Sequence, residues 1–196
     1  MITKNKVLMA QARASLSGKW GIAVCAALVY MLLVGPSSLI PYYLGTAAIA
    51  LIAGPFVLGL SMFFLALARG EEVQFEQIFK GFNYFGTALA AYLLVLVFTL
   101  LWMLLLIVPG IIASISYSQI FFILADNPEM GAMEALRRSK KMMYGYKWKY
   151  FCLGLRFIGW SLLCILTLGI GFLWLGPYIY TSNAKFYDDL KANSAF

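Results

Sequence analysis

Long uncharged stretches dominate the pattern of hydrophobic and polar positions along the chain. Residues 20–68 form 49 consecutive positions without a charge, residues 81–125 form 45, and residues 150–184 form 35 with a single charge at Arg156. Because an α-helix rises ~1.5 Å per residue, about 20 residues cross a hydrocarbon core of ~30 Å. Each stretch is therefore too long for one crossing and matches two helices joined by a tight turn.

Glycine and proline residues mark a turn within each stretch, because glycine frees the backbone and proline lacks the amide donor that a helix interior needs. The turns are expected at Gly35-Pro36-Ser37-Ser38 with Pro41 following, at Pro109-Gly110, and at Gly169-Ile170-Gly171. The spans are then expected at residues 20–40, 44–68, 86–108, 110–126, 150–168 and 172–188. The predicted fold class is all-α, a polytopic transmembrane helical bundle of six spans arranged as three hairpins.

Charge placement predicts which end of the hairpins faces the cytoplasm. Of the 15 Lys and Arg residues, 14 lie before residue 20, within 69–80, within 137–149 or after residue 184, and the predicted turns contain none. Basic residues favour the cytoplasmic side of a membrane. Three hairpins place every charged segment on that side, whereas three single crossings would not, so both termini are expected in the cytoplasm.

A cytoplasmic amphipathic helix is expected before each hairpin, ending in a glycine that an aromatic residue soon follows. The third helix is expected to be capped by Asn127, with Pro128 at its first position. The residues expected on the apolar faces are Met9, Ala12 and Leu16 in the first stretch, Phe75, Ile78 and Phe79 in the second, and Met133, Leu136 and Met143 in the third. We expect these helices to lie along the headgroup layer.

The glycines that end the three amphipathic stretches are nearly evenly spaced. Gly18, Gly81 and Gly145 are separated by 63 and 64 residues. Such spacing favours an internal threefold repeat, over residues 1–68, 69–126 and 127–196, within a single integral membrane domain that covers residues 1–196. No residue identity runs through all three copies, so chance spacing is the alternative.

Composition narrows the chemistry that the chain can perform. It is 63% hydrophobic and 12% charged, and its net charge of +7 is carried by residues that flank apolar segments, which favours membrane orientation over nucleic-acid binding. The absence of histidine removes the commonest general base and metal ligand. No P-loop, zinc-protease, serine-hydrolase or dinucleotide motif is present, so no enzyme and no cofactor is expected. An intramembrane enzyme that uses acids such as Asp126 is the weaker alternative.

Two sets of residues are candidates for function. Basic residues near the cytoplasmic surface attract anionic lipid, and polar residues at membrane depth either join helices or line a hydrophilic path. The candidate lipid or anion contacts are Arg137, Arg138, Lys140, Lys141 and Arg156, and the candidate polar face comprises Ser114, Tyr117, Ser118, Thr181, Ser182 and Asn183. For Arg156 the alternatives are snorkelling to the interface, or pairing with Asp126 or Asp188.

Several runs of residues resemble a bacterial integral-membrane family catalogued as domain of unknown function 975. The runs are Pro109-Gly110-Ile111-Ile112, Ser116-Tyr117-Ser118, Leu124-Ala125-Asp126-Asn127-Pro128-Glu129, Phe157-Ile158-Gly159-Trp160, and Leu166 through Trp174. The resemblance covers nearly the whole chain. It implies a small multi-pass protein of a bacterial cytoplasmic (inner) membrane and carries over no catalytic residues.

The leading hypothesis is a membrane protein without enzymatic activity that handles or transports lipid or a small solute. The basic interfacial helix 129–149, beside the polar faces of the fourth and sixth spans, motivates it, with membrane lipids, including anionic ones, as the expected partners. The alternative is a structural or accessory subunit that packs against another membrane protein or against further copies of itself.

Overall fold

The computed structural model describes residues 3–34, 42–167 and 169–193. Helix accounts for 85% of the structure, and the described residues contain no strand, which confirms the all-α fold class. The elements are α1 (Asn5–Leu16), α2 (Trp20–Val34), α3 (Tyr42–Arg69), the 3-10 helix η2 (Phe75–Tyr84), α4 (Phe85–Leu105), α5 (Ile107–Tyr117), α6 (Ile120–Asp126), α7 (Ala132–Met142), α8 (Lys147–Leu166) and α9 (Phe172–Asn193).

Among the residues that the structure describes, four helical segments are long and apolar enough to cross a membrane: Leu51–Arg69, Phe75–Leu105, Ile107–Asp126 and Lys147–Leu166. Counting α1 and α2 together, which meet at a bend of 100°, adds a fifth. α2 alone has 15 residues, fewer than the ~20 that a crossing needs. α9 is long enough, but its second half carries Lys185, Asp188, Asp189 and Lys191. Length and hydropathy of the described residues therefore support four or five crossings, and the six-span arrangement stays a prediction.

The turn between α8 and α9 confirms the prediction, whereas the turn between α4 and α5 corrects it. Gly169 lies between α8 and α9 with a φ of +86°, a conformation that favours glycine. The second break falls at Leu106, which is extended, and not at Pro109-Gly110. Proline is tolerated in the first turn of a helix, where its missing amide has no partner to lose. The first predicted turn, Gly35 to Ser38, lies outside the described residues.

Gly110 instead allows α5 to pack closely on α4. A Cβ atom at this position would lie 2.9 Å from Cα of Met103 and 3.0 Å from its backbone nitrogen. Only a residue without a side chain permits that approach. The proline-glycine pair that predicted a turn is thus part of the packing between two antiparallel helices.

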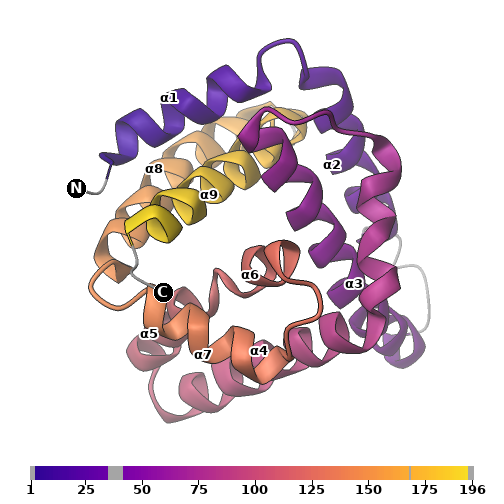
Figure 1. The fold of residues 1–196 in the computed structure, drawn as a ribbon, viewed down its shortest axis with the longest axis vertical. Coiled ribbons are helices and arrows are strands. Elements are labelled where there is room, and N and C mark those ends of the chain that lie inside the picture. The colour runs from indigo at the N-terminus through magenta and orange to yellow at the C-terminus, as the bar shows by residue number, and fades with distance from the viewer. Residues whose placement is uncertain (1–2, 35–41, 168, 194–196) are drawn as a thin grey trace.

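Three pairs of helices surround α6 when the molecule is viewed as in Figure 1: α2 with α3, α4 with α5, and α8 with α9. α3 is the central helix. In its segment Leu51–Arg69, 72% of the most apolar stretch is buried, whereas only 17% of the corresponding stretch of α8 is buried. The apolar side chains of α4 and α8 point outward, and Leu104 and Leu166 are 87% and 80% exposed. Apolar surface of this extent is compatible with a lipid environment.

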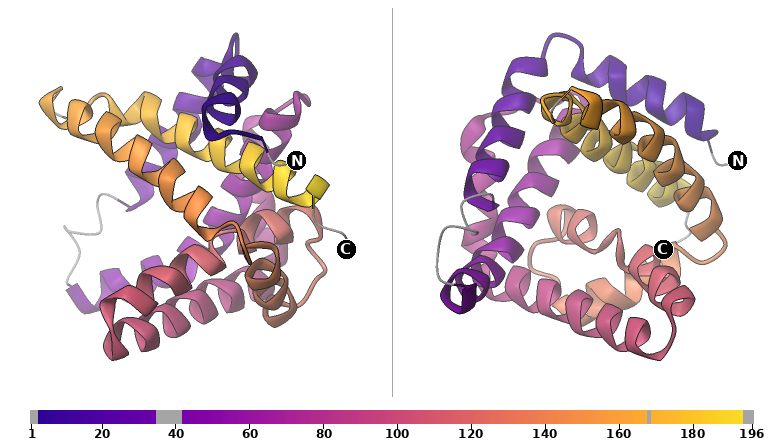
Figure 2. Two further views of the ribbon diagram at one scale, coloured as in Figure 1. Left: turned by 90° about the vertical axis from the view of Figure 1, so that its left-hand side faces the viewer. Right: turned by 180° about the vertical axis from the view of Figure 1, so that it is seen from behind.

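The two described turns lie at the same end of the molecule. In the left view of Figure 2, the α4–α5 and α8–α9 turns lie on one side, whereas the chain termini lie on the opposite side. Charged residues gather near the termini: Arg69, Asp126 and Asp188 form ion pairs there. The molecule therefore has an apolar end and a charged end.

The amphipathic helix α1 confirms its predicted face in Ala12 and Leu16, which are fully buried together with Leu8. α7 differs from its prediction. It begins at Ala132, after Gly131, and not at Pro128, because residues 127–130 form a turn closed by the Met130 amide and the Asn127 carbonyl.

The buried face of α7 also differs from the predicted one. Met133 is 41% exposed, while Leu136 and Met143 are buried as expected. Ala135 and Ser139 share the buried face with them. Small residues bring α7 close to its neighbours, so the large apolar Met133 is not needed in the contact.

The second amphipathic stretch is the 3-10 helix η2, which packs against α3. Ile78 is fully buried, but the predicted face member Phe79 is 46% exposed. Gly18 and Gly145 have φ angles of +79° and +83° and end their helices, whereas Gly81 has no such angle and lies against the backbone of α3. The three evenly spaced glycines therefore serve two different purposes.

Candidate functional site

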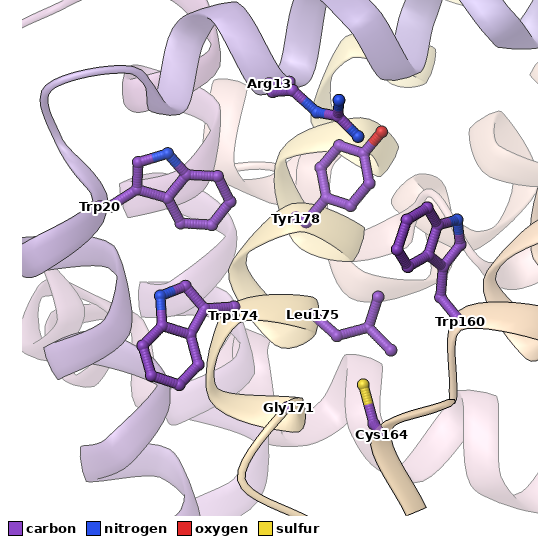
Figure 3. Close-up of a pocket in the computed structure, with 8 residues that line it drawn as sticks. All are labelled: Arg13, Trp20, Trp160, Cys164, Gly171, Trp174, Leu175 and Tyr178. Carbon is purple, nitrogen blue, oxygen red and sulfur yellow. The ribbon is translucent and has the colours of Figure 1, made fainter. Parts of the chain in front are cut away.

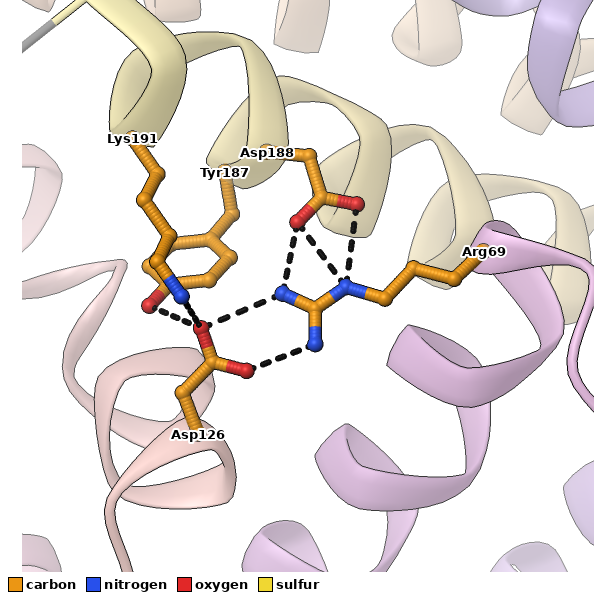
Figure 4. A network of polar contacts seen from close by, with 5 residues as sticks. All are labelled: Arg69, Asp126, Tyr187, Asp188 and Lys191. Carbon is orange, nitrogen blue, oxygen red and sulfur yellow. Dashed lines mark hydrogen bonds and ion pairs between the residues drawn. The ribbon is translucent and has the colours of Figure 1, made fainter.

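A cluster of five charged and polar side chains joins three helices at the charged end of the molecule (Figure 4). Arg69, the last residue of α3, donates from Nη1 to Oδ1 of Asp126 at 2.7 Å and from Nη2 to Oδ1 of Asp188 at 2.8 Å. Tyr187 and Lys191 donate to Oδ2 of Asp126 at 2.8 and 2.6 Å. We call these five residues the ionic clasp.

The ionic clasp is built around Asp126, the last residue of α6. Its side chain is 7% exposed, against 31% for Arg69 and 29% for Asp188. Charge-assisted hydrogen bonds of this length are about twice as strong as neutral ones. Because α3, α6 and α9 each contribute at least one partner, the ionic clasp ties the ends of all three helices together.

Arg69, rather than Arg156, is the partner of Asp126 and Asp188. Sequence reasoning missed Arg69, Tyr187 and Lys191 as participants. The available signal was that Arg69 and Asp126 are the first charged residues after the first two uncharged stretches. Equivalent positions in a hairpin repeat are expected to lie at the same depth, where opposite charges attract.

A second polar contact fastens the start of α1 to α8 and α9. Asp189 accepts from the backbone amide and hydroxyl of Thr3, the latter at 2.6 Å, and from Lys149 Nζ at 2.9 Å. Burial alone would raise the pKa of the Asp189 carboxyl, but the bonds from Thr3 and Lys149 hold that pKa below its usual range. The carboxylate is therefore charged at neutral pH and holds α1 in place.

The predicted basic residues of α7 lie on its outer side. Arg137, Lys140 and Lys141 are exposed and Arg138 is partly buried. Lys140 also lines a cavity of about 170 Å³, whose wall includes Trp102 and Tyr117. The basic helix thus places a cation beside an aromatic pocket between α4 and α5.

Arg156 is exposed on α8 and faces α1 rather than α7. It shares an open groove of about 530 Å³ with Lys6 and Arg13. The structure therefore separates the predicted basic set into two parts: the α7 residues, and Arg156 with new basic neighbours from α1. No sequence signal joined Arg156 to α1, because residues 6 and 156 lie at opposite ends of the chain.

The predicted polar face is divided between two helices: Ser114, Tyr117 and Ser118 belong to α5 and its C-terminal cap, whereas Thr181, Ser182 and Asn183 belong to α9. Ser114, Ser118 and Thr181 donate to carbonyls of their own helices. Tyr117 packs against Phe98 with ring centroids 6.3 Å apart. Ser182 is fully buried and Asn183 is partly buried. A hydrophilic path along these residues stays a prediction.

The chain matches a family model described as "Protein of unknown function (DUF975)" over residues 1–116 and 102–194. No curated protein and no solved structure matches the chain. The two matched ranges together cover nearly the whole sequence, in agreement with the resemblance carried by the runs around Pro109, Asp126 and Trp160. The chain belongs to the DUF975 family.

Proposed function

We propose that the protein is a six-span, multi-pass protein of a bacterial cytoplasmic membrane that handles anionic lipid or a small anionic solute at its cytoplasmic face. In this arrangement α2 and α9 are the fifth and sixth crossings. The charged second half of α9 emerges into the cytoplasm. Both termini are then cytoplasmic.

The observation that carries the lipid proposal is the outward-facing basic side of α7. Its opposite side is buried against the helices of the preceding hairpin, including Ala135 and Ser139. Arg137 and Lys140 project from the exposed side, next to an aromatic cavity. A basic helix held parallel to the headgroups attracts anionic lipid, at about 1 kcal/mol for each basic residue near the surface.

The six-span topology predicts the labelling of single cysteines in a background without Cys25, Cys152 and Cys164. Leu106→Cys and Ile170→Cys lie at the hairpin turns and are 63% and 60% exposed as leucine and isoleucine. A membrane-impermeant maleimide is expected to label both in intact cells. Tyr144→Cys, at a position 82% exposed, is expected to react only after lysis. Labelling of Tyr144→Cys in intact cells, or none at either turn, would contradict this topology.

The lipid proposal predicts enrichment of anionic lipid around the protein. In nanodiscs of equal phosphatidylglycerol and phosphatidylcholine, the lipids that leave with the protein in native mass spectrometry should be richer in phosphatidylglycerol than the bulk. Replacing Arg137 and Lys140 by glutamine should lower the ratio of phosphatidylglycerol to phosphatidylcholine among the retained lipids at least about fivefold, because two contributions of ~1 kcal/mol are removed.

The matched control keeps the charge: Arg137→Lys with Lys140→Arg should retain the enrichment. A wild-type lipid shell with the composition of the bulk membrane would overturn the lipid proposal. Equal enrichment of phosphatidylglycerol around the glutamine variant and the charge-keeping variant would also overturn the lipid proposal. A discrete protein partner that co-purifies with a lipid-indifferent chain would favour the role of accessory subunit instead.

A further inference from the structure

An open groove between α1, α8 and α9 changes from basic to aromatic along its length. Three adjoining cavities form it, with volumes of about 630, 530 and 350 Å³, and neighbouring cavities share lining residues such as Arg156 and Trp160. One face of α8 lines it throughout, because its contributions recur every three or four residues. They are Lys149, Cys152, Arg156, Trp160 and Cys164.

The basic end of the groove lies under α1. Lys6 and Arg13, two turns apart on one face of α1, oppose Arg156 on α8. None of the described residues that line the three cavities is acidic. Lys149 is already paired with Asp189 and is not counted among the available cations. The middle of the groove therefore presents three cations to whatever occupies it.

The other end of the groove is apolar and aromatic (Figure 3). Trp20, Trp160 and Trp174 lie around Leu175 and Cys164. Trp160 and Trp174 are about half exposed, so their rings form walls of the groove and not part of the core. Cys164 lies eight positions after Arg156, which corresponds to about 12 Å along α8 and is less than the ~15 Å thickness of one leaflet.

Arg13 and Tyr178 connect the two ends. The Arg13 guanidinium lies over the Tyr178 ring, 5.6 Å from its centroid. The Tyr178 hydroxyl donates to the Met9 carbonyl at 3.3 Å, and its ring packs edge-on against Phe157. These contacts fix α1 to α9 above the aromatic cavity, so Arg13 is held at the boundary between the charged and apolar parts.

A cation, a tryptophan and a tyrosine also lie together at the cavity beside α7. Lys140 lies 127 residues after Arg13, as Gly145 lies 127 residues after Gly18, and both helices end at a glycine of positive φ. Lys140 lines its cavity with Trp102 and Tyr117, and Arg13 lines its cavity with Trp160 and Tyr178. The same arrangement therefore occurs twice: an amphipathic helix supplies a cation, and a pair of helices supplies a tryptophan and a tyrosine. The cavity in the α1 groove is the larger of the two.

We infer that the α1 groove holds one anionic phospholipid, with its phosphate between Lys6, Arg13 and Arg156 and an acyl chain along Trp160 and Trp174. The three cations of the groove favour an anionic group, and the aromatic end favours an apolar tail that belongs to the same molecule. Arginine favours phosphate because its donors form a planar fork. The inference rests on the proposed membrane location but uses residues other than those of α7.

The test titrates the full-length protein in mild detergent with dioleoylphosphatidylglycerol and measures the first bound lipid by native mass spectrometry. Replacing Arg13 and Arg156 by glutamine should weaken binding of the first lipid at least about tenfold, since two charge-assisted contacts are lost. Ala10→Trp, which fills the groove without changing a charge, should weaken it as well, because exposed Ala10 lines the basic part. Dioleoylphosphatidylcholine should bind the wild type at least about tenfold less tightly.

The matched control is the double glutamine variant at Lys80 and Lys185, which removes the same charge outside both the groove and α7 and should leave the first binding event within about twofold. Equal weakening by this control and by the Arg13 and Arg156 variant would overturn the groove. Weakening by the Arg137 and Lys140 glutamine variant alone would also overturn the groove, but would leave the lipid proposal for α7 intact. Equal binding of the two lipids to the wild type would overturn both. An unchanged thermal transition of Ala10→Trp shows that its loss of binding is not a loss of fold; tight binding in that variant would also overturn the groove.

Discussion

Replacing Asp126 by asparagine should lower the free energy of unfolding by about 3 kcal/mol, which is the cost of removing one partner of a buried ion pair. The neutral amide keeps the size of the carboxylate but leaves the charges of Arg69 and Lys191 without their shared acceptor. For a chain of this length the midpoint of thermal unfolding should fall by roughly 6–12 °C. Tryptophan fluorescence or circular dichroism in detergent, at one fixed scan rate, measures the shift.

Asp188→Asn is the matched control for that substitution. It removes the same charge from the same cluster, but Asp188 is 29% exposed and is bonded to Arg69 alone within the ionic clasp. The loss should be about 1 kcal/mol, the range of partly exposed ion pairs. If the two variants were equally stable, Asp126 would not be the residue that organises the clasp.

The position of the ionic clasp has a consequence for the proposed function. It lies at the charged end of the molecule, where α3, α6 and α9 end close together, while the described turns lie at the opposite end. The helical pairs are therefore fastened by charge at one end and by packing along their length. The candidate lipid-binding residues lie outside the ionic clasp, on α7 and in the α1 groove. In the proposed function, bound lipids therefore exchange with the membrane without breaking the ion pairs of the clasp.

The charge pattern predicted the helical segments well, because long uncharged runs in this chain are best explained by helices that are long and apolar enough to cross a membrane. Helix ends at Arg69, Asp126 and Leu166 lie within a few residues of the boundaries inferred from the sequence, and the predicted end of the first span at residue 40 lies outside the described residues. Hairpin turns were less predictable. Pro109 is compatible with either a turn or the first turn of a helix, and only the approach of Gly110 to Met103 decides between them.

The candidate sites were less predictable than the fold, since they depend on which helices become neighbours. The basic side of α7 follows from the spacing of Arg137 and Lys140 within one segment. The approach of Arg156 to Lys6 joins residues 150 positions apart and depends on how α1 crosses α8. Met133 illustrates the same limit: periodicity places it on an apolar face, but close packing of Ala135 and Ser139 leaves it outside.

Replacing Gly59 by alanine should destabilise the protein by about 3 kcal/mol, the upper end of the cost of overpacking. A methyl group at Gly59 would overlap the Ile78 carbonyl, with the Ile78 Cα at 3.3 Å, so the obstacle is backbone. Gly81 meets α3 from the other side: its Cβ would lie 2.6 Å from the Gly59 nitrogen. Small residues permit such close contact between helices in membranes.

Gly81→Ala should cost a similar amount, and the double variant Gly59→Ala with Gly81→Ala should lose less than the two single losses combined. Each methyl group separates the same pair of elements, η2 and α3, so the second one meets a contact that is already open. Gly154→Ala is the control, because no atom lies within 4 Å of a Cβ there and helix propensity favours alanine by up to about 1 kcal/mol. Thermal unfolding of the four variants in the same detergent measures these differences. Additive losses, or a stable Gly59→Ala, would show that η2 is not held against α3 by backbone contact.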